Sequence, residues 1–405
     1  MEFTSAFFSA NRKRLLEETG AELVVLSAHG LLQRSADTTF LFRQDSNFWY
    51  LTGIAEPDYI LVLAAGAEFL IAPPRAEHRD LWDGAIDSKR LLNESGVAEL
   101  IDHHDGWNRL DRLIKKYKKI HTITPAESFF VSFGFYANPA RGALLAALKK
   151  HRSAELFDIR KTLARMRQVK QPVELDSLKK AISITVDTLQ DIRAKLIDYG
   201  TEYELVADVT AGFIRRGASG HAYQPIIAGG ANAATIHYVR CNDDIDSNSL
   251  LLFDVGAEVN NYSADISRTY ARNKPTPRQN QVYEAVARVH FAACALLKPG
   301  VDMKSYEQAV DSLMAVELKR LGLLQDETDK KKLKRYYPHL TSHFLGLDTH
   351  DAADYERPLE AGMVLTVEPG IYIPAEGIGV RIEDDVLITK TGIEVLSARL
   401  PCSLI

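Results

Sequence analysis

A chain of 405 residues, 46% hydrophobic and 25% charged, has the composition of an ordinary globular protein, and its length predicts two domains rather than one core. A net charge of −5 gives it no electrostatic reason to bind nucleic acid or anionic lipid. The sequence contains no run of about 18 apolar residues, so no membrane span is expected.

The cysteines and the N-terminal segment favour a reducing compartment. Cys241, Cys294 and Cys402 form no CxxC motif, so their spacing predicts neither a disulfide framework nor a thiolate zinc site. The first apolar stretch precedes the basic residues, whereas a signal peptide has the opposite order. We therefore expect a cytoplasmic protein.

The N-terminal part, residues 1–165, alternates apolar strands with helical patterns. Strands are expected at 22–28, 59–65 and 68–74, and helices at 109–119 and 140–151. Such alternation predicts an α/β domain. No residues with metal-ligand spacing occur in it, so we expect a scaffold that carries no chemistry of its own.

The predicted boundary lies within residues 165–178, which leaves a second domain at 166–405. Pro172 begins a helical pattern that continues to about residue 199, and proline is tolerated there because its missing N–H would be unpaired anyway. Further elements are predicted in the order helix 203–216, strand pair 249–270, helices 278–298 and 302–322, and strand pair 363–389. Helices followed by a hairpin occur twice, which predicts two related halves.

The first strand pair carries two aspartates. Asp254 ends the apolar run LLLFD, and Asp265 returns nearly opposite it after the turn signal Asn260-Asn261. Two buried ionised carboxylates on neighbouring strands repel each other, so such a pair requires a shared proton, an arginine or a metal ion. The alternative is a pair at a strand end that points into water, which the unbroken apolar residues before Asp254 disfavour.

The second strand pair repeats this arrangement with two glutamates. Glu368 ends an apolar strand before a Pro-Gly bend, and Glu383 lies in a predicted strand whose residues 380–385 alternate between its faces. Arg381 is expected on the same face as Glu383. Taken alone, a plain salt bridge between these two would be the favoured interpretation.

Histidines are the other candidate ligands. His339, His343 and His350 lie within 12 residues, between the two strand pairs, and His237 follows a Gly/Ala-rich turn region. A single histidine is more often a packed or surface residue than a ligand. Three histidines so close together favour a metal-binding or catalytic site.

The combined charge of these residues indicates two divalent metal ions. Asp254, Asp265, Glu368 and Glu383 carry four negative charges, which two divalent cations would balance with one neutral imidazole as the fifth ligand. Carboxylates with imidazole suit Mn²⁺, Co²⁺, Zn²⁺ or Fe²⁺. The alternative is five unrelated polar residues, four of them on apolar strands.

The motifs around these residues resemble those of the pita-bread-fold metallopeptidases, in particular the Xaa-Pro aminopeptidase (aminopeptidase P) and prolidase family. The similar stretches are DVGAEVNNYSADISRTY, HFLGLDTHD, TVEPGIYI and GVRIEDDVLI. RSADTTFLFRQDSNFWYLTG resembles the N-terminal domain that aminopeptidase P and prolidase share. The resemblance implies an N-terminal creatinase/aminopeptidase P-like α/β domain followed by a pita-bread domain with pseudo-two-fold halves, an α/β (α+β) fold.

The resemblance also implies a role for each candidate residue. Asp254 would chelate one metal ion, Asp265 and Glu383 would bridge two, and His343 and Glu368 would bind the other. The ions would be Mn²⁺, with Co²⁺ or Zn²⁺ as alternatives. Glu368 would also take the proton of the attacking water. The remaining residues would contact the substrate or brace its pocket: His237, His350, His339, Tyr372 and Arg381.

The implied substrate is a peptide with proline in second position, cleaved before the proline. Prolidase, which cleaves only dipeptides, is the nearest rival; a metal-independent creatinase-like hydrolase and a metal-free binding relative are others. The resemblance further implies a dimer or tetramer in which Asp37 and Trp82 reach a neighbouring active site. No nucleic-acid or membrane partner is expected.

Overall fold

The computed structural model describes residues 2–76, 78–124, 128–151 and 154–405, and the chain divides into two compact units, residues 1–166 and 167–405. Each unit combines helices with β-sheet. None of the helices in the described ranges is long and apolar enough to cross a membrane.

The first unit contains a six-stranded mixed sheet in the order β6-β5-β4-β1-β7-β8. Its strands are β1 (Leu23–Ser27), β4 (Ile60–Ala64), β5 (Ala67–Ile71), β6 (Glu99–Ile101), β7 (Lys119–Thr122) and β8 (Glu155–Asp158). The three strands predicted here are β1, β4 and β5, which pair antiparallel along their whole length. Their buried apolar runs explain why the sequence pattern was sufficient to find them.

Helices and a short hairpin complete the first unit. They are α1 (Ser5–Thr19), β2 (Gln33–Ser35), β3 (Thr38–Thr39), α2 (Ser46–Thr52), α3 (Arg79–Asp83), α4 (Ser88–Ser95), α5 (His103–Tyr117), α6 (Ser128–Phe133) and α7 (Pro139–Leu148), with α8 (Arg160–Gln168) running across the junction. The predicted helix at 109–119 is α5, and it begins earlier because the Asp102 side chain caps it at the Asp105 N–H. Leu110 and Ile114 of α5 belong to the core of the sheet.

The first half of the second unit consists of two helices and a three-stranded sheet. The helices are α9 (Pro172–Ala194) and α10 (Glu202–Arg215); the strands are β10 (Ile226–Gly229), β11 (Leu250–Val255) and β14 (Ile266–Ala271), in that order across the sheet. Pro172 is the first residue of α9, as predicted, and Glu174 completes a capping box with Gln171.

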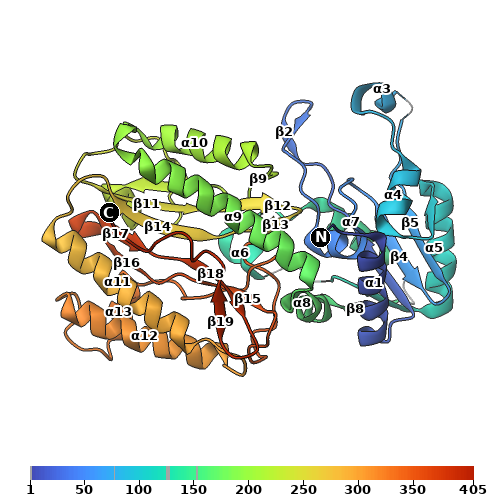
Figure 1. The fold of residues 1–405 in the computed structure, drawn as a ribbon. Coiled ribbons are helices and arrows are strands. Elements are labelled where there is room, and N and C mark those ends of the chain that lie inside the picture. The colour runs from blue at the N-terminus through green and yellow to red at the C-terminus, as the bar shows by residue number, and fades with distance from the viewer. Residues whose placement is uncertain (1, 77, 125–127, 152–153) are drawn as a thin grey trace. The chain divides into compact units, whose positions relative to one another are not determined.

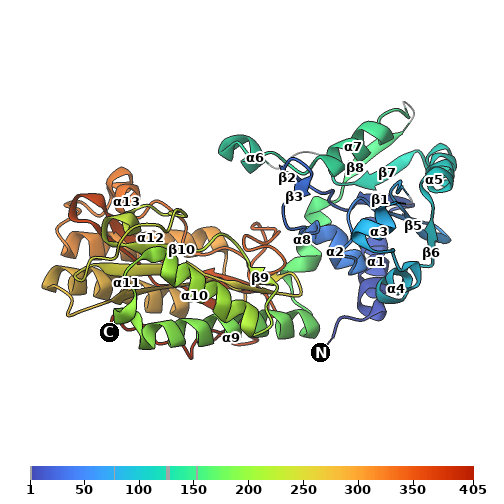
Figure 2. The same cartoon turned by 90° about the horizontal axis from the view of Figure 1, so that it is seen from above.

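The second half repeats this order. It contains α11 (Pro277–Leu296), α12 (Met303–Arg320), α13 (Lys330–Tyr336), β15 (Val364–Val367), β16 (Gly370–Ile373), β17 (Ile378–Arg381), β18 (Asp384–Ile388) and β19 (Ile393–Val395). In Figure 1, α9 and α10 lie on one side of the strands of this unit and α11 and α12 on the other. Figure 2, turned by 90°, shows α9 and α10 in front of the strands. Each helix pair packs on the apolar face of its own hairpin, so the halves have separate cores that meet at the strands.

Both hairpins are interrupted at mid-length. In the first, Gly256 separates β11 from β12 (Ala257–Val259), and Asp265 stands between β13 (Tyr262–Ser263) and β14. In the second, Glu368 follows β15 and Glu383 precedes β18. The prediction of one continuous strand through 380–385 is therefore wrong at Ile382 and Glu383. The Glu383 N–H instead donates to the carbonyl of Ser267 in the other half, at 3.0 Å, which breaks the ladder and joins the two hairpins.

Gly256 makes the interruption in the first hairpin possible. A Cβ atom at this position would lie 1.8 Å from the Ala264 carbonyl oxygen and 3.1 Å from the Tyr223 ring. Only a residue without a side chain permits this approach, which brings the chain segments containing Asp254 and Asp265 together.

We predict that Gly256→Ala destabilises the protein by about 3 kcal/mol, because the added methyl group forces the two segments apart. Chemical denaturation followed by far-ultraviolet circular dichroism measures the loss. Gly392→Ala is the matched control, because nothing lies within 4 Å of a Cβ there. An unchanged denaturation midpoint for Gly256→Ala would contradict the close approach.

Candidate metal centre

The breaks in the two hairpins bring four carboxylates and one histidine to the same place in the second unit. Asp254 lies near the end of β11, and Asp265, Glu368 and Glu383 occupy the interruptions themselves. His343 comes from the loop before β15, whose backbone is held against that strand: Thr366 N–H donates to the His343 carbonyl at 2.9 Å. His343 is thereby fixed beside Glu368.

The two aspartates meet diagonally rather than face to face. Asp254 is paired in register with Ser267, and Asp265 precedes Ser267 by two residues. The hydroxyl of Tyr223 lies 2.5 Å from Oδ1 of Asp254 and 2.5 Å from Oδ1 of Asp265. One hydroxyl has a single proton, so it can donate to only one of these carboxylates at a time.

His343 lies between the carboxylates of Asp265 and Glu368. Its Nε2 is 3.4 Å from Oδ2 of Asp265 and 3.4 Å from Oε1 of Glu368. Ligand atoms of Asp265, His343 and Glu383 all lie within 4.8 Å of one another. Asp265, His343, Glu368 and Glu383 therefore lie close together, and the Tyr223 hydroxyl connects Asp254 to them.

Arg381 is buried at one side of this group. Its ion pair is with Asp254, at 2.5 Å, and the salt bridge to Glu383 that the sequence alone favours is replaced by an indirect contact. Arg381 Nε donates to Ser267 Oγ at 2.8 Å, and Ser267 Oγ donates to Glu383 Oε2 at 2.6 Å. Arg381 Nη1 donates to the Tyr372 hydroxyl at 2.7 Å, so all three guanidinium nitrogens are engaged.

Burial and mutual repulsion make the negative charges in this group costly. Burial raises the pKa of Glu368 to about 8, and the charges of Asp265 and Asp254 contribute. Burial and the charge of Asp265 likewise raise the pKa of Glu383 well above its ordinary value. Although burial acts against it, the contacts with Asp265 and Glu368 raise the pKa of His343 to about 9. The protein's own groups therefore hold protons here that a cation would displace.

These residues fit a pair of divalent metal ions. Once these protons leave, Arg381 offers one positive charge against four carboxylates, which leaves most of the negative charge to be balanced by a cation. Buried carboxylates without enough counter-charge are strongly destabilising, and oxygen donors with one imidazole are a suitable set for Mn²⁺, Co²⁺ or Zn²⁺. The five residues that could hold such ions are Asp254, Asp265, His343, Glu368 and Glu383.

Three further histidines surround the group. His339 Nε2 lies 2.8 Å from the Tyr372 hydroxyl, and burial together with Arg381 lowers the pKa of His339 to about 3. The His350 ring stands at 75° to that of His343 with centroids 4.4 Å apart, and burial and His343 lower its pKa to about 4. His237, which is exposed, acts electrostatically on both rings, also lowering their pKa values. His339 and His350 are therefore neutral at neutral pH.

Several residues of this centre are not among those that the sequence identifies as candidates. Tyr223, which contacts both aspartates, lies in a segment without any recognisable motif. Ser267 connects Arg381 with Glu383 from the middle of a strand. Glu307, on α12, accepts the N–H groups of Thr341 and Ser342 at 2.8 and 3.0 Å and so anchors the loop that carries His343. These contacts depend on the fold and have no fixed sequence spacing.

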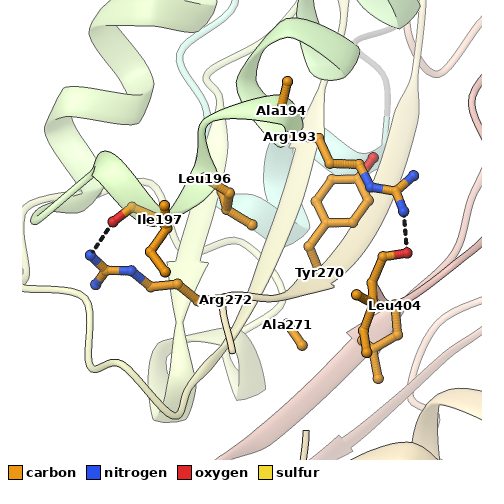
Figure 3. Close-up of a pocket in the computed structure, with 9 residues that line it drawn as sticks. Arg193, Ala194, Leu196, Ile197, Tyr270, Ala271, Arg272 and Leu404 are labelled. Atoms are coloured by element: carbon orange, nitrogen blue, oxygen red, sulfur yellow. Dashed lines mark hydrogen bonds between the residues drawn. The ribbon is translucent and has the colours of Figure 1, made fainter. Parts of the chain in front are cut away.

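A surface hollow elsewhere in this unit contains none of these residues (Figure 3). It is lined by Arg193, Ala194, Leu196, Ile197, Tyr270, Ala271, Arg272, Leu404 and Ile405. Both of its arginines are already engaged, Arg272 with the Ile197 carbonyl at 2.8 Å and Arg193 with Ser403 Oγ at 2.7 Å. It offers no carboxylate, imidazole or thiol side chain for catalysis.

Comparison with known proteins identifies relatives over nearly the whole chain. Residues 176–390 match the model of "Metallopeptidase family M24", and residues 8–121 match "Aminopeptidase P, N-terminal domain". An Xaa-Pro aminopeptidase of Haemophilus influenzae is 32% identical over 91% of this chain and 88% of that protein.

Solved structures agree with this result. A putative aminopeptidase P from Bacillus anthracis has a TM-score of 0.89 at 30% identity and covers 99% of this chain and 96% of its own. A Zn-substituted Escherichia coli aminopeptidase P in complex with product has a TM-score of 0.86 at 28% identity. The match covers 100% of this chain and 97% of the Escherichia coli chain. The expected fold class is thereby confirmed.

We predict that metal affinity rises steeply as the pH is raised from about 6 to about 9. Protons on His343 and Glu368, whose pKa values are about 9 and about 8, must leave before these residues can bind an ion. Each displaced proton contributes about a tenfold gain in affinity per pH unit below the pKa. Calorimetric titration of metal-free protein with Mn²⁺ in buffers of different ionisation enthalpy counts the released protons. Affinity that does not change with pH would contradict the charge state assigned to this centre.

Proposed function

The chain belongs to metallopeptidase family M24 and carries an aminopeptidase P N-terminal domain, and on this premise we propose that it removes the N-terminal residue from peptides whose second residue is proline. The observation that supports this most directly is the convergence of four carboxylates and His343 around one point of the second unit. A metallopeptidase requires such a centre, and the relatives from Haemophilus influenzae and Escherichia coli, which match 91% and 98% of this chain, are named Xaa-Pro aminopeptidases.

We propose that this centre holds two divalent ions, with Mn²⁺ as the metal. Asp254 would bind one ion, His343 and Glu368 the other, and Asp265 and Glu383 both. When bound, such ions lower the pKa of a coordinated water and polarise the carbonyl oxygen of the substrate. Arg381 and Tyr223 hold Asp254 in position for this role, because each contacts a different oxygen of its carboxylate at 2.5 Å.

Glu368 is the proposed proton carrier. Its carboxylate is 3.4 Å from His343 and 3.7 Å from His339, so it lies between the metal ligands and the histidines assigned to the substrate. It would accept the proton of the attacking water and return it to the proline nitrogen, which leaves as a secondary amine. Such proton transfer by a positioned side chain is general acid–base catalysis.

The histidines around the centre suit a substrate-binding role. His237 and His350 would donate N–H groups to the negative charge that develops on the carbonyl oxygen, an oxyanion-hole contact. His339 and Tyr372 would brace the proline pocket through a hydrogen-bonded chain that continues to Arg381. His350 is neutral at neutral pH, so one of its ring nitrogens carries a proton to donate.

The engagement of Arg381 favours peptides longer than a dipeptide. An Xaa-Pro dipeptide has a free carboxylate next to its proline, which must be paired with a cation if it is buried. Arg381 is a buried cation of this centre, and its three nitrogens are already engaged with Asp254, Tyr372 and Ser267. A peptide that extends beyond proline avoids this cost.

We further propose that the chain assembles as a dimer or tetramer. The first unit exposes large apolar side chains, including Leu41, Leu81 and Trp82 at 99%, 89% and 78% of their accessible area. Exposed apolar side chains of this size are typical of surfaces that bind another protein. Asp37 and Trp82 would be contributed to the active site of a neighbouring chain.

We predict that Glu368→Gln lowers kcat by about 10²–10⁴-fold, because the substitution retains the length of the side chain and removes the proton carrier. Hydrolysis of an Xaa-Pro-Yaa tripeptide with Mn²⁺ measures the effect, and bound metal is counted in the same sample. Glu394→Gln is the control, since Glu394 is an exposed residue of the same unit. A Glu368→Gln enzyme within tenfold of the parent would exclude this role.

We predict a higher kcat/KM for an Xaa-Pro-Yaa tripeptide than for the matching Xaa-Pro dipeptide. Competition between the two in one reaction gives this ratio directly. A clear preference for the dipeptide would identify a prolidase and would leave the metal centre as described.

We predict that multi-angle light scattering at micromolar concentration gives the mass of a dimer or tetramer. Trp82→Ala should lower this mass or weaken the association, because it removes an exposed anchor from the proposed contact. The mass of a single chain for the unmodified protein would disprove the assembly.

A further inference from the structure

A second group of metal-binding side chains lies next to the candidate metal centre but shares no residue with it. His290 and Cys294 are one turn apart on α11, Asp384 begins β18, and Cys402 belongs to the C-terminal segment. Ligand atoms of His290, Asp384 and Cys402 all lie within 4.8 Å of one another. The residues are far apart in the sequence, which is why cysteine spacing gave no reason to expect a thiolate site.

Contacts among His290, Asp384 and Cys402 are close to those of a tetrahedral metal site, and Cys294 approaches this group through His290. His290 Nε2 is 2.9 Å from Asp384 Oδ2, Cys402 Sγ is 3.7 Å from the same oxygen, and Cys294 Sγ is 3.8 Å from His290 Nε2. Zinc lies about 2.0–2.3 Å from nitrogen, oxygen and sulfur ligands, so neighbouring ligands of a tetrahedral ion are about 3.3–3.8 Å apart. The shortest contact therefore needs to open by only a few tenths of an ångström.

The two oxygens of Asp384 have different partners. Oδ1 accepts hydrogen bonds from Arg268 Nη2 and Ser397 Oγ, both at 2.6 Å. Oδ2 faces His290 and Cys402. Hydrogen bonds to the far oxygen of a ligating carboxylate fix its orientation, and here they are already formed.

The charges of the group also balance when an ion is present. A coordinating thiol loses its proton, so two thiolates and Asp384 carry three negative charges. A divalent ion and the buried Arg268 supply three positive charges. The result is a neutral buried site, which avoids the cost of an unpaired charge.

Buried polar atoms near the group lack hydrogen-bond partners in the part of the chain that the structure describes, but His290 Nδ1 is the ring nitrogen that faces away from Asp384, so its lack of a partner is not evidence for an ion. Among the described residues, His290 Nδ1 and the hydroxyl of Tyr283 are buried without a hydrogen-bond partner. Tyr283 is only 6% exposed, and burial and the neighbouring Cys402 both raise its pKa. Cys402 itself is half-buried.

We propose that His290, Cys294, Asp384 and Cys402 bind a divalent cation that prefers sulfur ligands, such as Zn²⁺ or Cd²⁺. This ion is separate from those of the peptidase centre, whose ligands are carboxylates and one imidazole. Hard ions such as Mn²⁺ select oxygen donors, so the two sites differ in the metal that they prefer. The bound ion links α11, β18 and the C-terminal segment.

Titration of metal-free protein with Co²⁺ tests this site specifically. A cobalt–thiolate bond gives a charge-transfer absorption in the near ultraviolet, and the peptidase centre contains no thiol, so this band reports only the proposed site. We expect the band in the unmodified protein, a loss of most of its intensity in Cys402→Ser, and full intensity in Cys241→Ser, which removes a cysteine outside the group. Absence of the band in the unmodified protein, or its persistence in the Cys294→Ser/Cys402→Ser double variant, would overturn the proposal.

A count of bound Zn²⁺ gives an independent measurement. After equilibrium dialysis, the unmodified protein should retain one more ion per chain than Cys402→Ser, while both should hydrolyse a tripeptide equally well with Mn²⁺. Equal zinc counts would overturn the proposal without affecting the peptidase assignment. If Cys402→Ser fails to fold by circular dichroism, the cobalt spectrum of the unmodified protein alone decides.

Discussion

Negative charge buried without sufficient counter-charge is the constraint on which the second unit depends. Asp265, Glu368 and Glu383 lie close together, and burial raises the pKa of each carboxyl group. A fold that brings such groups together is stable only if protons or cations neutralise them. The same repulsion that makes the empty arrangement costly gives it a strong attraction for divalent metal ions.

The fold meets this constraint by interrupting both hairpins at the positions of the candidate ligands. A continuous ladder would use the backbone groups of Glu383 within its own hairpin, whereas here its N–H bonds to Ser267 in the other half. Arg268 reinforces this link, because its Nη1 donates to the carbonyls of Ser267 and Glu383 at 2.9 and 2.6 Å. The ligands of the two halves are thus held together by buried polar contacts, and the helix pairs supply the apolar cores behind them.

Much of this organisation is predictable from sequence because it depends on local patterns. Apolar runs ending in Asp254 and Glu368, the Asn260-Asn261 turn, in which both residues have positive φ, and Pro172 at a helix start are visible without coordinates. The family motifs add the order of the candidate ligands.

Other features depend on contacts that sequence spacing does not encode. The break at Ile382 and Glu383 follows from a hydrogen bond between Glu383 and Ser267, 116 positions away. The alternating sequence pattern contains no sign of this contact, so it predicts a continuous strand. Tyr223 and Glu307 act on the centre from segments with no motif. The group around Asp384 joins side chains from a helix, a strand and the C-terminal segment.

The number of manganese ions bound per chain shows whether these carboxylates form a two-ion site. Metal-free protein is dialysed against Mn²⁺ and the bound metal is counted by mass spectrometry, in parallel with Asp265→Asn, which removes the carboxylate proposed to contact both ions. We expect two ions per chain in the unmodified protein and a marked loss of bound metal in the variant. Two ions retained in Asp265→Asn, or none in the unmodified protein, would contradict the two-ion site.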